Sequence, residues 1–589
     1  MLKETVRSMV LVACVLGVAS PASAGQFGRV LQIVYFTPAD REPVEGYRER
    51  LDRVMGEVQS FYGAGMAARG FGAMTFPLER GGDGRVVIHL VKGKHETDFY
   101  TGERGDELRR EAVTALAKEG IDADRETIVI FENLVHTEGD HLSADCPYYG
   151  GGDHKSGTAW VTDHAVLDAL NLTKTEPIIY DGDRRYSVGK YNSVYIGGVT
   201  HELGHALGLP HVRATRDEAT MGTSLMGSGN YTFREEARCE GKGTFLSRAS
   251  ALALSTHPLF RRSDEGKDLG IECTLTRVRG EPIAGGMLVH GQVATSMAPI
   301  GLIAFTDPDG GSDYDSLTST ARVDPQGRFS VRTGEFRPGG YELRLTFCYP
   351  TGATISFPLP FSVDDRGFPD HRALEPALLK ARAVAALIKG DSEAARAFAL
   401  AAVEKVESIP EALLTDGLRA IARKSASLTD LASAKPTTEP GPAPAALAGH
   451  IERAFLSDLT WESAEVGWEK PCRDRIPGEE GPGWLESGEG YHSHGLYAHA
   501  PSRYVFRLGG AWARFTSACG LQQGAQGSVV FVVLGDGREL YRSAVVKDFR
   551  ERPVDLDVSG VDVLELVVDE AEFGNYQDCS VWFSPEIAR

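Results

Sequence analysis

Apolar residues along the chain follow two different periods, and the change from one to the other marks the predicted elements. Runs rich in β-branched and aromatic residues, typical of buried strands, occupy residues 29–37, 84–93 and 126–135. Between them, apolar residues recur at helical spacing over 43–70 and over 105–120. Strands and helices that alternate in this way predict an α/β layer, a twisted sheet that carries helices.

The pattern changes again toward the C-terminus. Short apolar runs separated by turn clusters such as DPDGGSDYDS indicate a β-sandwich, an Ala- and Leu-rich stretch indicates helices, and a Pro- and Ala-rich stretch indicates an extended linker. We therefore expect a multidomain protein. Its predicted parts are a signal peptide (1–24), an α/β or α+β domain (25–265), an immunoglobulin-like β-sandwich (268–366), a helical segment (370–427), a Pro/Ala-rich linker (428–448) and a second β-sandwich (449–589).

The first 24 residues have the pattern of an export signal. Lys3 and Arg7 precede an apolar run, and the small residues at 22–24 suit a signal peptidase, so cleavage is expected directly after them. The apolar run is too short to span a bilayer comfortably, and no later run is long enough. We expect a secreted or periplasmic, extracellular protein. Lipid attachment at Cys14, where LVAC resembles a lipoprotein processing site, is the less favoured alternative.

The chain is acidic, with a formal net charge of −20 at pH 7. Loss of residues 1–24 removes two positive charges and one negative charge, which leaves −21. Nucleic acids and anionic lipids need a basic footprint on their protein partner. We therefore expect no nucleic-acid partner and no integral membrane span.

Cysteine usage agrees with an oxidising compartment. None of the cysteines left after cleavage shows the short paired spacing of a zinc–thiolate site, so disulfide bonds are the expected state. Within the predicted domains, the natural pairs are Cys146 with Cys239 and Cys273 with Cys348. One of the remaining cysteines must be free or paired elsewhere; these are Cys472, Cys519 and Cys579.

One short stretch concentrates residue types that bind metal. The sequence VTHELGHALGLPH, residues 199–211, lies in a predicted helix whose N-cap is expected at Asn192 or Ser193. His201 and His205 are four residues apart, so both imidazoles leave the same face of the helix, one turn apart. This is the spacing that two ligands of one ion need.

The residues around these two histidines complete a catalytic pattern. Glu202 lies beside His201, placed to act on a metal-bound water without being a ligand. Gly208 tolerates the positive φ that ends the helix sharply, so that His211 can approach as the third ligand. Three neutral imidazoles with an open fourth position are the ligands of catalytic zinc, which predicts hydrolysis of peptide bonds. A helix whose histidines only satisfy local hydrogen bonds is the alternative.

The full pattern His-Glu-x-x-His-x-x-Gly-x-x-His, followed by SLMG with Met226, resembles the metzincin superfamily of zinc metallopeptidases. The resemblance covers roughly residues 26–262 and implies that Met226 forms an apolar floor beneath the three histidines. The sequence departs from the family at Ser228, where some members have a tyrosine that acts as an extra ligand or transition-state donor. The first predicted strand also begins within about five residues of the expected cleavage site, which argues against an inhibitory pro-segment.

Polar residues also gather just before this helix, in YYGGGDHKSGTAWVTDH, residues 148–164. Within the resemblance this region approaches the cleft, and TAWVTD, residues 158–163, is expected to supply the edge strand that pairs with a substrate backbone. Asp153, His154 and Asp163 offer ligands for a second metal. Ordinary polarity of a surface loop is the preferred interpretation.

The C-terminal block contains LSDLTW, HSHGLYAHAPSRYVFRLGGAWARFTSACGL, VVFVVLGDGRELYRS, VDLDVSGVDVLELVV and DCSVWFSPEI in this order. This order resembles the NPCBM domain, a carbohydrate-binding module with a jelly-roll, galactose-binding-like fold. Tyr504, Phe506 and Leu508 alternate with Arg503 and Arg507, as in a strand with one buried face. Sugar sites use exposed aromatic faces, but we assign no sugar-binding residue among the tryptophans of this block.

Together these features predict a secreted zinc endopeptidase that its C-terminal module targets to glycans or glycoproteins. Its partners would be a protein or glycoprotein substrate and a glycan ligand. The alternative is a non-catalytic, carbohydrate-binding surface protein with a peptidase-like scaffold, against which the intact Glu202 argues. A hydrolase of non-peptide amides fits the motif chemistry but not the metzincin pattern.

Overall fold

A computed structural model describes the chain over residues 29–102, 104–143, 145–311, 313–434, 440–477, 483–572, 574 and 577–589. The expected signal peptide, with Cys14, lies outside these residues. The chain divides into two compact units. The first takes the residues up to 274 together with 294–335 and 344–357, and the second takes 275–293, 336–343 and 358–589. Among the described residues, no helix is long and apolar enough to cross a membrane.

The first unit is built on a mixed, mostly parallel sheet. Its strands are β1 (Gln32–Thr37), β2 (His89–Lys92), β3 (Thr127–Glu132), β6 (Tyr149–Gly152) and β7 (Gly157–Thr162). Their order is β2-β1-β3-β7-β6, and only β6 is antiparallel to its neighbour. β1 and β3 are buried at every position, because inner strands of a sheet covered on both faces need continuous apolar runs.

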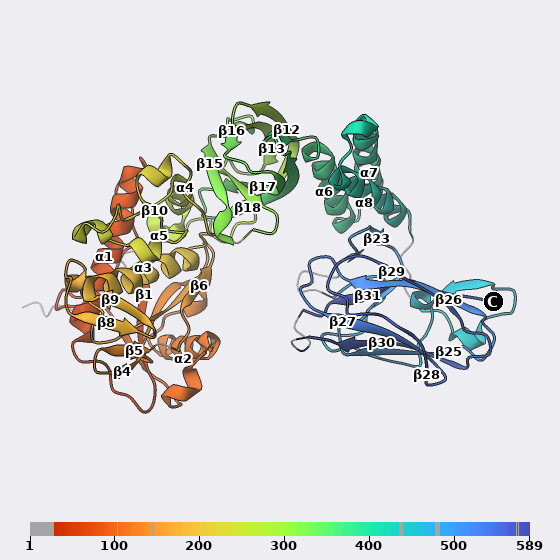
Figure 1. Ribbon diagram of the computed structural model, residues 1–589, viewed down its shortest axis with the longest axis horizontal. Helices are drawn as coiled ribbons and strands as arrows, with labels where there is room; N and C mark the ends of the chain where they lie inside the picture. The colour runs from red at the N-terminus through yellow and green to blue at the C-terminus, as the bar shows by residue number, and fades with distance from the viewer. Residues whose placement is uncertain are drawn as a thin grey trace, which may run out of the picture. The chain divides into compact units, whose positions relative to one another are not determined.

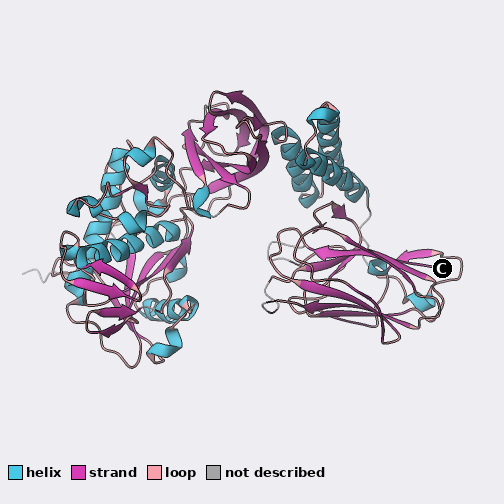
Figure 2. Cartoon of the chain, viewed as in Figure 1, coloured by secondary structure: helices cyan, strands magenta, loops and turns pink. Residues whose placement is uncertain are grey.

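Helices cover both faces of this sheet and make the unit an α/β structure (Figures 1 and 2). The helices are α1 (Tyr47–Ala68), α2 (Gly105–Lys118), α3 (Val188–Ala206), α4 (Arg248–Thr256) and α5 (Pro258–Arg261). α1, α3, α4 and α5 share one apolar core on one face, whereas α2 packs on the opposite face through Leu108 and Leu116. The predicted alternation of strands and helices is therefore confirmed in outline.

Shorter strands flank these layers. They are β4 (His136–Glu138), β5 (His141–Ser143), β8 (Ile178–Asp181), β9 (Arg184–Ser187), β10 (Thr223–Ser224) and β11 (Thr244–Phe245). The first four form one small sheet in sequence order, and β10 pairs with β11. β8 and β9 contact α3, so the small sheet supports that helix.

A β-rich segment follows α5. Its strands are β12 (Cys273–Ile283), β13 (Gly286–Thr295), β14 (Gly301–Pro308), β15 (Leu317–Ala321), β16 (Arg328–Gly334), β17 (Gly339–Cys348), β18 (Thr354–Val363) and β19 (Pro369–Asp370). Within the first unit, β14 pairs antiparallel with β15. Ile303 and Phe305 of β14 and Cys348 of β17 enter the same core as α3 and α4. The core of the first unit therefore extends past residue 265.

The second unit contains helices and a β-sandwich. The helices are α6 (Leu374–Ile388), α7 (Ser392–Glu407) and α8 (Asp416–Ser433). One sheet has the order β20-β31-β26-β29 with β24 beside β31, and the other has the order β21-β25-β30-β27-β28. These strands are β20 (Arg453–Phe455), β21 (Ser463–Glu465), β24 (Gly495–Tyr497), β25 (Ser502–Arg507), β26 (Arg514–Leu521), β27 (Val529–Gly535), β28 (Arg538–Arg542), β29 (Arg552–Asp557), β30 (Val563–Glu570) and β31 (Ser580–Ala588).

The two sheets lie face to face as separate layers (Figure 1). Residues from both sheets form one apolar core, in which Phe515 of β26 and Phe531 of β27 are completely buried. On β25, Tyr504 and Phe506 point into this core whereas Arg503 and Arg507 are exposed. The predicted alternation along this strand is therefore confirmed.

Within the second unit, α8 packs against the sandwich through the strands β22 (Leu485–Glu486) and β23 (Tyr491–His492). Ser427 of α8 accepts a hydrogen bond of 2.8 Å from the backbone N–H of Tyr491. Lys424 forms a 2.7 Å ion pair with Glu486. These contacts join the helical segment to the sandwich.

The predicted disulfide pairs do not form, because every described cysteine is a free thiol. Cys146 lies half-buried near Glu132, and burial raises the pKa of its thiol to about 12. Cys239 instead lies exposed in a turn, with φ 59°. Cys273 and Cys348 both lie near Tyr349 without bonding to each other. Sequence position alone carries no information on the direction of these side chains.

Candidate metal centre

Helix α3 carries the histidine motif and begins earlier than the sequence suggests. Its N-cap is Ser187, whose Oγ accepts a 3.1 Å hydrogen bond from the backbone N–H of Lys190. The prediction of Asn192 or Ser193 as N-cap is wrong, because both are fully buried inside the helix. The Asn192 side chain accepts a 2.8 Å hydrogen bond from the backbone of Asp168 instead.

The end of α3 turns the chain back toward its own last turn. Gly208 has φ 78°, in the region that favours glycine. The N–H groups of Gly208 and Leu209 donate hydrogen bonds to the carbonyls of His205 and Gly204. This closed turn lets the chain that follows bring His211 back toward the helix.

The three histidines converge on one point. Their Nε2 atoms lie 3.1 Å apart for His201 and His205, 3.3 Å for His201 and His211, and 2.9 Å for His205 and His211. Tetrahedral zinc with Zn–N bonds of about 2.0–2.1 Å requires about 3.3 Å between ligand nitrogens. The described residues thus place the three side chains at the spacing of a tripod, and all three form one group able to hold an ion.

The position of the proton on two of these rings suits a bound cation at the point where the histidines converge. Nδ1 of His201 lies 2.7 Å from the carbonyl oxygen of Leu225, and Nδ1 of His205 lies 2.8 Å from that of Leu209. A carbonyl only accepts, so each Nδ1 carries the proton and each neutral ring presents a bare lone pair at Nε2. Burial lowers the pKa of His201 to about 4, which keeps this ring neutral. Two lone pairs that face each other at 3.1 Å fit a shared metal ion.

Glu202 lies next to this point in a nearly buried position. Only 9% of the residue is exposed. Burial raises the pKa of its carboxyl to about 8, although a hydrogen bond from the backbone of Gly150 opposes the shift. A carboxyl with such a pKa can both take and return a proton near neutral pH.

Glycines bring the sheet into direct contact with α3. A Cβ atom at Gly150 would lie 2.1 Å from the carbonyl oxygen of Glu202. Cβ atoms at Gly152 and Gly157 would lie 2.4 Å and 1.9 Å from that of Ala206. Gly150 and Gly152 of β6 and Gly157 of β7 therefore let these strands lie directly against α3, which no hydrophobic pattern would indicate.

Met226 packs against α3 within the motif. It is completely buried, and its Sδ would lie 2.4 Å from a Cβ atom at Gly204, between the two helical histidines. Its carbonyl accepts a 2.9 Å hydrogen bond from the N–H of Val212, next to His211. Met221, by contrast, is 39% exposed.

The prediction that residues 158–163 supply the edge strand of the sheet is wrong. Residues 158–162 of this stretch fall in β7, which lies between β3 and β6 and has no free side, and Asp163 directly follows the strand. The edge next to the histidines is β6, residues 149–152. Strand order decides which strand is an edge, and a single run of apolar residues does not reveal that order.

A pocket of about 520 Å³ opens over the motif. Besides the histidines and Glu202, its walls include Tyr148 and Tyr149 of the β6 region. A further wall comes from the β-rich segment and was not expected from the sequence; its residues are Asp307, Tyr314, Ser316 and Arg344. The stretch DPDGGSDYDS indicates a turn, but nothing in it shows which part of the chain the turn faces.

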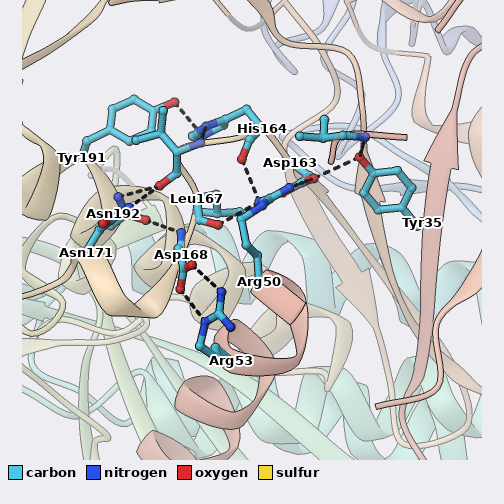
Figure 3. A network of polar contacts seen from close by, with 12 residues as sticks. Tyr35, Arg50, Arg53, Asp163, His164, Leu167, Asp168, Asn171, Tyr191 and Asn192 are labelled. Carbon is cyan, nitrogen blue, oxygen red and sulfur yellow. Dashed lines mark hydrogen bonds and ion pairs between the residues drawn. The ribbon is translucent and has the colours of Figure 1, made fainter. Parts of the chain in front are cut away.

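The residues considered for a second metal do not converge. Asp163 is completely buried and forms a two-pronged ion pair with Arg50, at 2.7 Å and 2.9 Å, and accepts a hydrogen bond from Tyr35 (Figure 3). His154 faces the carbonyl of Lys267 instead. The interpretation of Asp163 as an ordinary polar residue of a surface loop is therefore wrong. Its ion pair joins the end of β7 to α1.

The region after Asp163 is also tied into the interior. His164 lies 2.8 Å from the hydroxyl of Tyr191 on α3, and burial lowers the pKa of His164 to about 3 (Figure 3). The backbone carbonyls of His164 and Leu167 accept hydrogen bonds from Arg50. This buried network fixes the base of α3 relative to the sheet.

The tryptophans in the sandwich of the second unit differ clearly in solvent exposure. Trp512 and Trp582 are core residues. Trp461 and Trp484 are half-buried, and each is covered by an arginine guanidinium 3.3 Å from the ring. Trp468 is 48% exposed. Among the residues that the structure describes, it is the most exposed tryptophan of this sandwich.

Comparison with known proteins assigns this sandwich. Residues 452–588 match the NPCBM/NEW2 domain family. This part of the chain is an NPCBM domain. A protein named as an endo-alpha-N-acetylgalactosaminidase from Renibacterium salmoninarum is 30% identical over 135 residues, which are 22% of this chain and 9% of that protein. The chain thus spans only a small part of that relative's length.

A solved structure extends the likeness beyond the NPCBM domain. OgpA from Akkermansia muciniphila is similar at 25% identity and a TM-score of 0.50, over 59% of this chain and 96% of OgpA. This share is more than twice the length of residues 452–588, so it takes in residues outside them. A catalytically inactive OgpA, solved with an O-glycopeptide substrate, glycodrosocin, matches at 25% identity and a TM-score of 0.49 over 57% of this chain and 93% of that one.

Proposed function

We propose that this protein is a secreted, zinc-dependent endopeptidase of metzincin type that cleaves O-glycosylated proteins. The observation that carries the proposal is the convergence of three Nε2 atoms beside the buried carboxyl of Glu202, in one pocket. The likeness to OgpA, which binds an O-glycopeptide substrate, supports the substrate class. The NPCBM domain supports a second contact with glycans.

The donor set suits zinc as the metal. His201, His205 and His211 would hold the ion and leave a fourth position open toward the pocket. Zinc bound there would supply a Lewis acid and a water of lowered pKa. Met226 and Gly204 support the ligands from below through close packing.

The side chains of this chain would carry out the proton transfers. A carboxylate oxygen of Glu202 takes a proton from the attacking water and delivers it to the nitrogen of the leaving amine. The buried position of Glu202 keeps bulk water from competing for that proton. The antiparallel edge β6 offers backbone groups with which an extended substrate can pair.

The test compares the natural protein with Glu202→Gln, using an O-glycosylated peptide and the same peptide without sugar. We expect one zinc per chain in both proteins, cleavage of the glycosylated peptide, and a loss of about 10²–10⁴-fold in kcat for Glu202→Gln, because the general base is removed. Glu138→Gln, an exposed carboxylate on β4, is the control and should behave as the natural protein.

Each result has a distinct meaning. Bound zinc without cleavage of any peptide or protein would favour the carbohydrate-binding scaffold over the enzyme. Equal cleavage of both peptides would leave the peptidase but reject the O-glycoprotein as its substrate class.

A further inference from the structure

The β-rich segment places one aromatic ring on the third histidine. Tyr314 lies in the turn Asp313–Asp315, between β14 and β15. Its ring centroid is 3.8 Å from that of His211, with 26° between the planes, which is a stacked contact. The ring is also nearly parallel to that of His201, at 6.5 Å. Tyr314 therefore lies over the histidine cluster while remaining 44% exposed.

The turn that carries Tyr314 is anchored to the chain that carries His211. The N–H of Arg213 donates a 2.8 Å hydrogen bond to the carbonyl of Ser316, which is nearly completely buried. Farther along, the N–H of Arg216 donates to the carboxylate of Glu335 at 2.8 Å and 3.0 Å. A backbone hydrogen bond thus holds the turn that carries Tyr314 against the chain that follows His211.

The three histidines differ in the support of their backbone. His201 and His205 lie in α3, whose hydrogen bonds fix their Cα positions, and both Nδ1 atoms are tied to backbone carbonyls. His211 lies beyond the helix, in a stretch without regular secondary structure. Its neighbour Val212 is held by Met226, and one face of its ring is covered by Tyr314.

We propose that Tyr314 is a positioning residue that fixes the plane of the His211 imidazole, so that Nε2 of His211 points at the centre shared with His201 and His205. The proposal rests on the proposed metal centre. It assigns the β-rich segment a part in the site, because this segment supplies the ring that stacks on His211. The proposal assigns this role to the ring face of Tyr314, which makes the stacked contact with His211.

The test measures zinc affinity in the full chain, by competition with a chromophoric chelator at neutral pH, for Tyr314→Ala and Tyr314→Phe. Loss of a group that orients a ligand typically weakens metal binding 10–100-fold. We expect Tyr314→Ala to bind zinc about tenfold more weakly and Tyr314→Phe to remain within about twofold of the natural protein. Thermal unfolding of the three zinc-free proteins should nearly coincide, since Tyr314 lies at the surface and is 44% exposed.

Tyr231→Ala is the matched control, because Tyr231 is also 44% exposed but does not line the pocket. It should leave zinc affinity unchanged. Unchanged affinity in Tyr314→Ala, or an equal loss in Tyr314→Phe, would overturn the proposal; the latter would assign the role to the hydroxyl. If the natural protein binds no zinc, the proposed function itself fails, so the two failures are distinguishable.

Discussion

The protonation state of its imidazole rings decides whether the histidine cluster can hold a metal. Neutral imidazole is the ligand form, and burial lowers the pKa of His201 to about 4 and that of His205 below its ordinary value. A lowered pKa extends the neutral form to lower pH. We therefore expect protonation of these two rings not to weaken zinc binding near pH 6.5, the ordinary histidine value, so that any fall in affinity there involves one ring at most. Chelator competition over a pH series checks this, and a fall near pH 6.5 steeper than about tenfold per pH unit would contradict it.

A second residue-scale prediction concerns Gly204. Alanine normally stabilises a helix interior relative to glycine, but a Cβ atom here would lie 2.4 Å from Sδ of Met226. We expect Gly204→Ala to lower the free energy of unfolding by about 1–3 kcal/mol through overpacking. The control is Gly56→Ala in α1, where a Cβ atom meets nothing within 4 Å. It should stabilise by about 0.5–1 kcal/mol. Chemical denaturation of both variants measures the difference, and equal signs would contradict the packing argument.

Residues close together in the sequence could be predicted, whereas residues joined only by the fold could not. The spacing of His201 and His205 as ligands follows from helix geometry, and Gly208 predicts the turn that ends the helix. Tyr314 and Arg344 reach the same pocket from the β-rich segment, and no local pattern links them to the motif. The burial of Asp163 was missed for the same reason, since its partner Arg50 lies on a distant helix.

At the scale of elements, the ion pair of Arg50 and Asp163 joins α1 to the end of β7. Burial works against the charge of Arg50, but its hydrogen bond and attraction to Asp163 outweigh this effect and raise its pKa. Arg50→Met would leave a buried carboxylate without its partner. We expect a loss of about 3–5 kcal/mol in the free energy of unfolding, measured by denaturant titration.

The matched control for this pair is exposed. Arg80→Met removes a 2.9 Å ion pair with Asp52 at the surface, where solvent screens both charges. This change should cost about 0–1 kcal/mol. Adding Asp163→Leu to Arg50→Met should recover much of the loss, because no unpaired buried charge remains. Similar costs for the buried and exposed pairs would show that the network of Figure 3 does not hold α1 and β7 together.

The apolar patterns in the sequence predicted the buried strands of the sheet well, but they did not predict which strands pair with one another. The fully apolar runs gave β1 and β3 because both faces of those strands are covered. Whether β6 or β7 forms the edge depends on pairing between strands, which the alternation within one strand does not encode. The glycines of β6 had a structural meaning only once α3 was found lying against them.

At the scale of the whole molecule, the NPCBM domain offers one exposed tryptophan. If Trp468 stacks on a sugar, Trp468→Ala should weaken binding of the full chain to immobilised mucin about fivefold to tenfold. The measurement uses a Glu202→Gln background so that the surface is not cleaved. Phe368→Ala removes an aromatic ring that is 62% exposed outside the NPCBM domain, and should have no effect. If both variants bind equally well, Trp468 does not contact the glycan.

The apolar core of the first unit has a consequence for the order in which the chain folds. Ile303, Phe305 and Cys348 complete a core whose other buried residues all lie before residue 265, so part of that core stays uncovered until these later residues are present. A polypeptide is synthesised from its N-terminus. The core that packs against α3 is therefore complete only when the β-rich segment is present. Recombinant fragments that stop near residue 265 should aggregate, whereas those that continue past residue 357 should fold and acquire the metal centre.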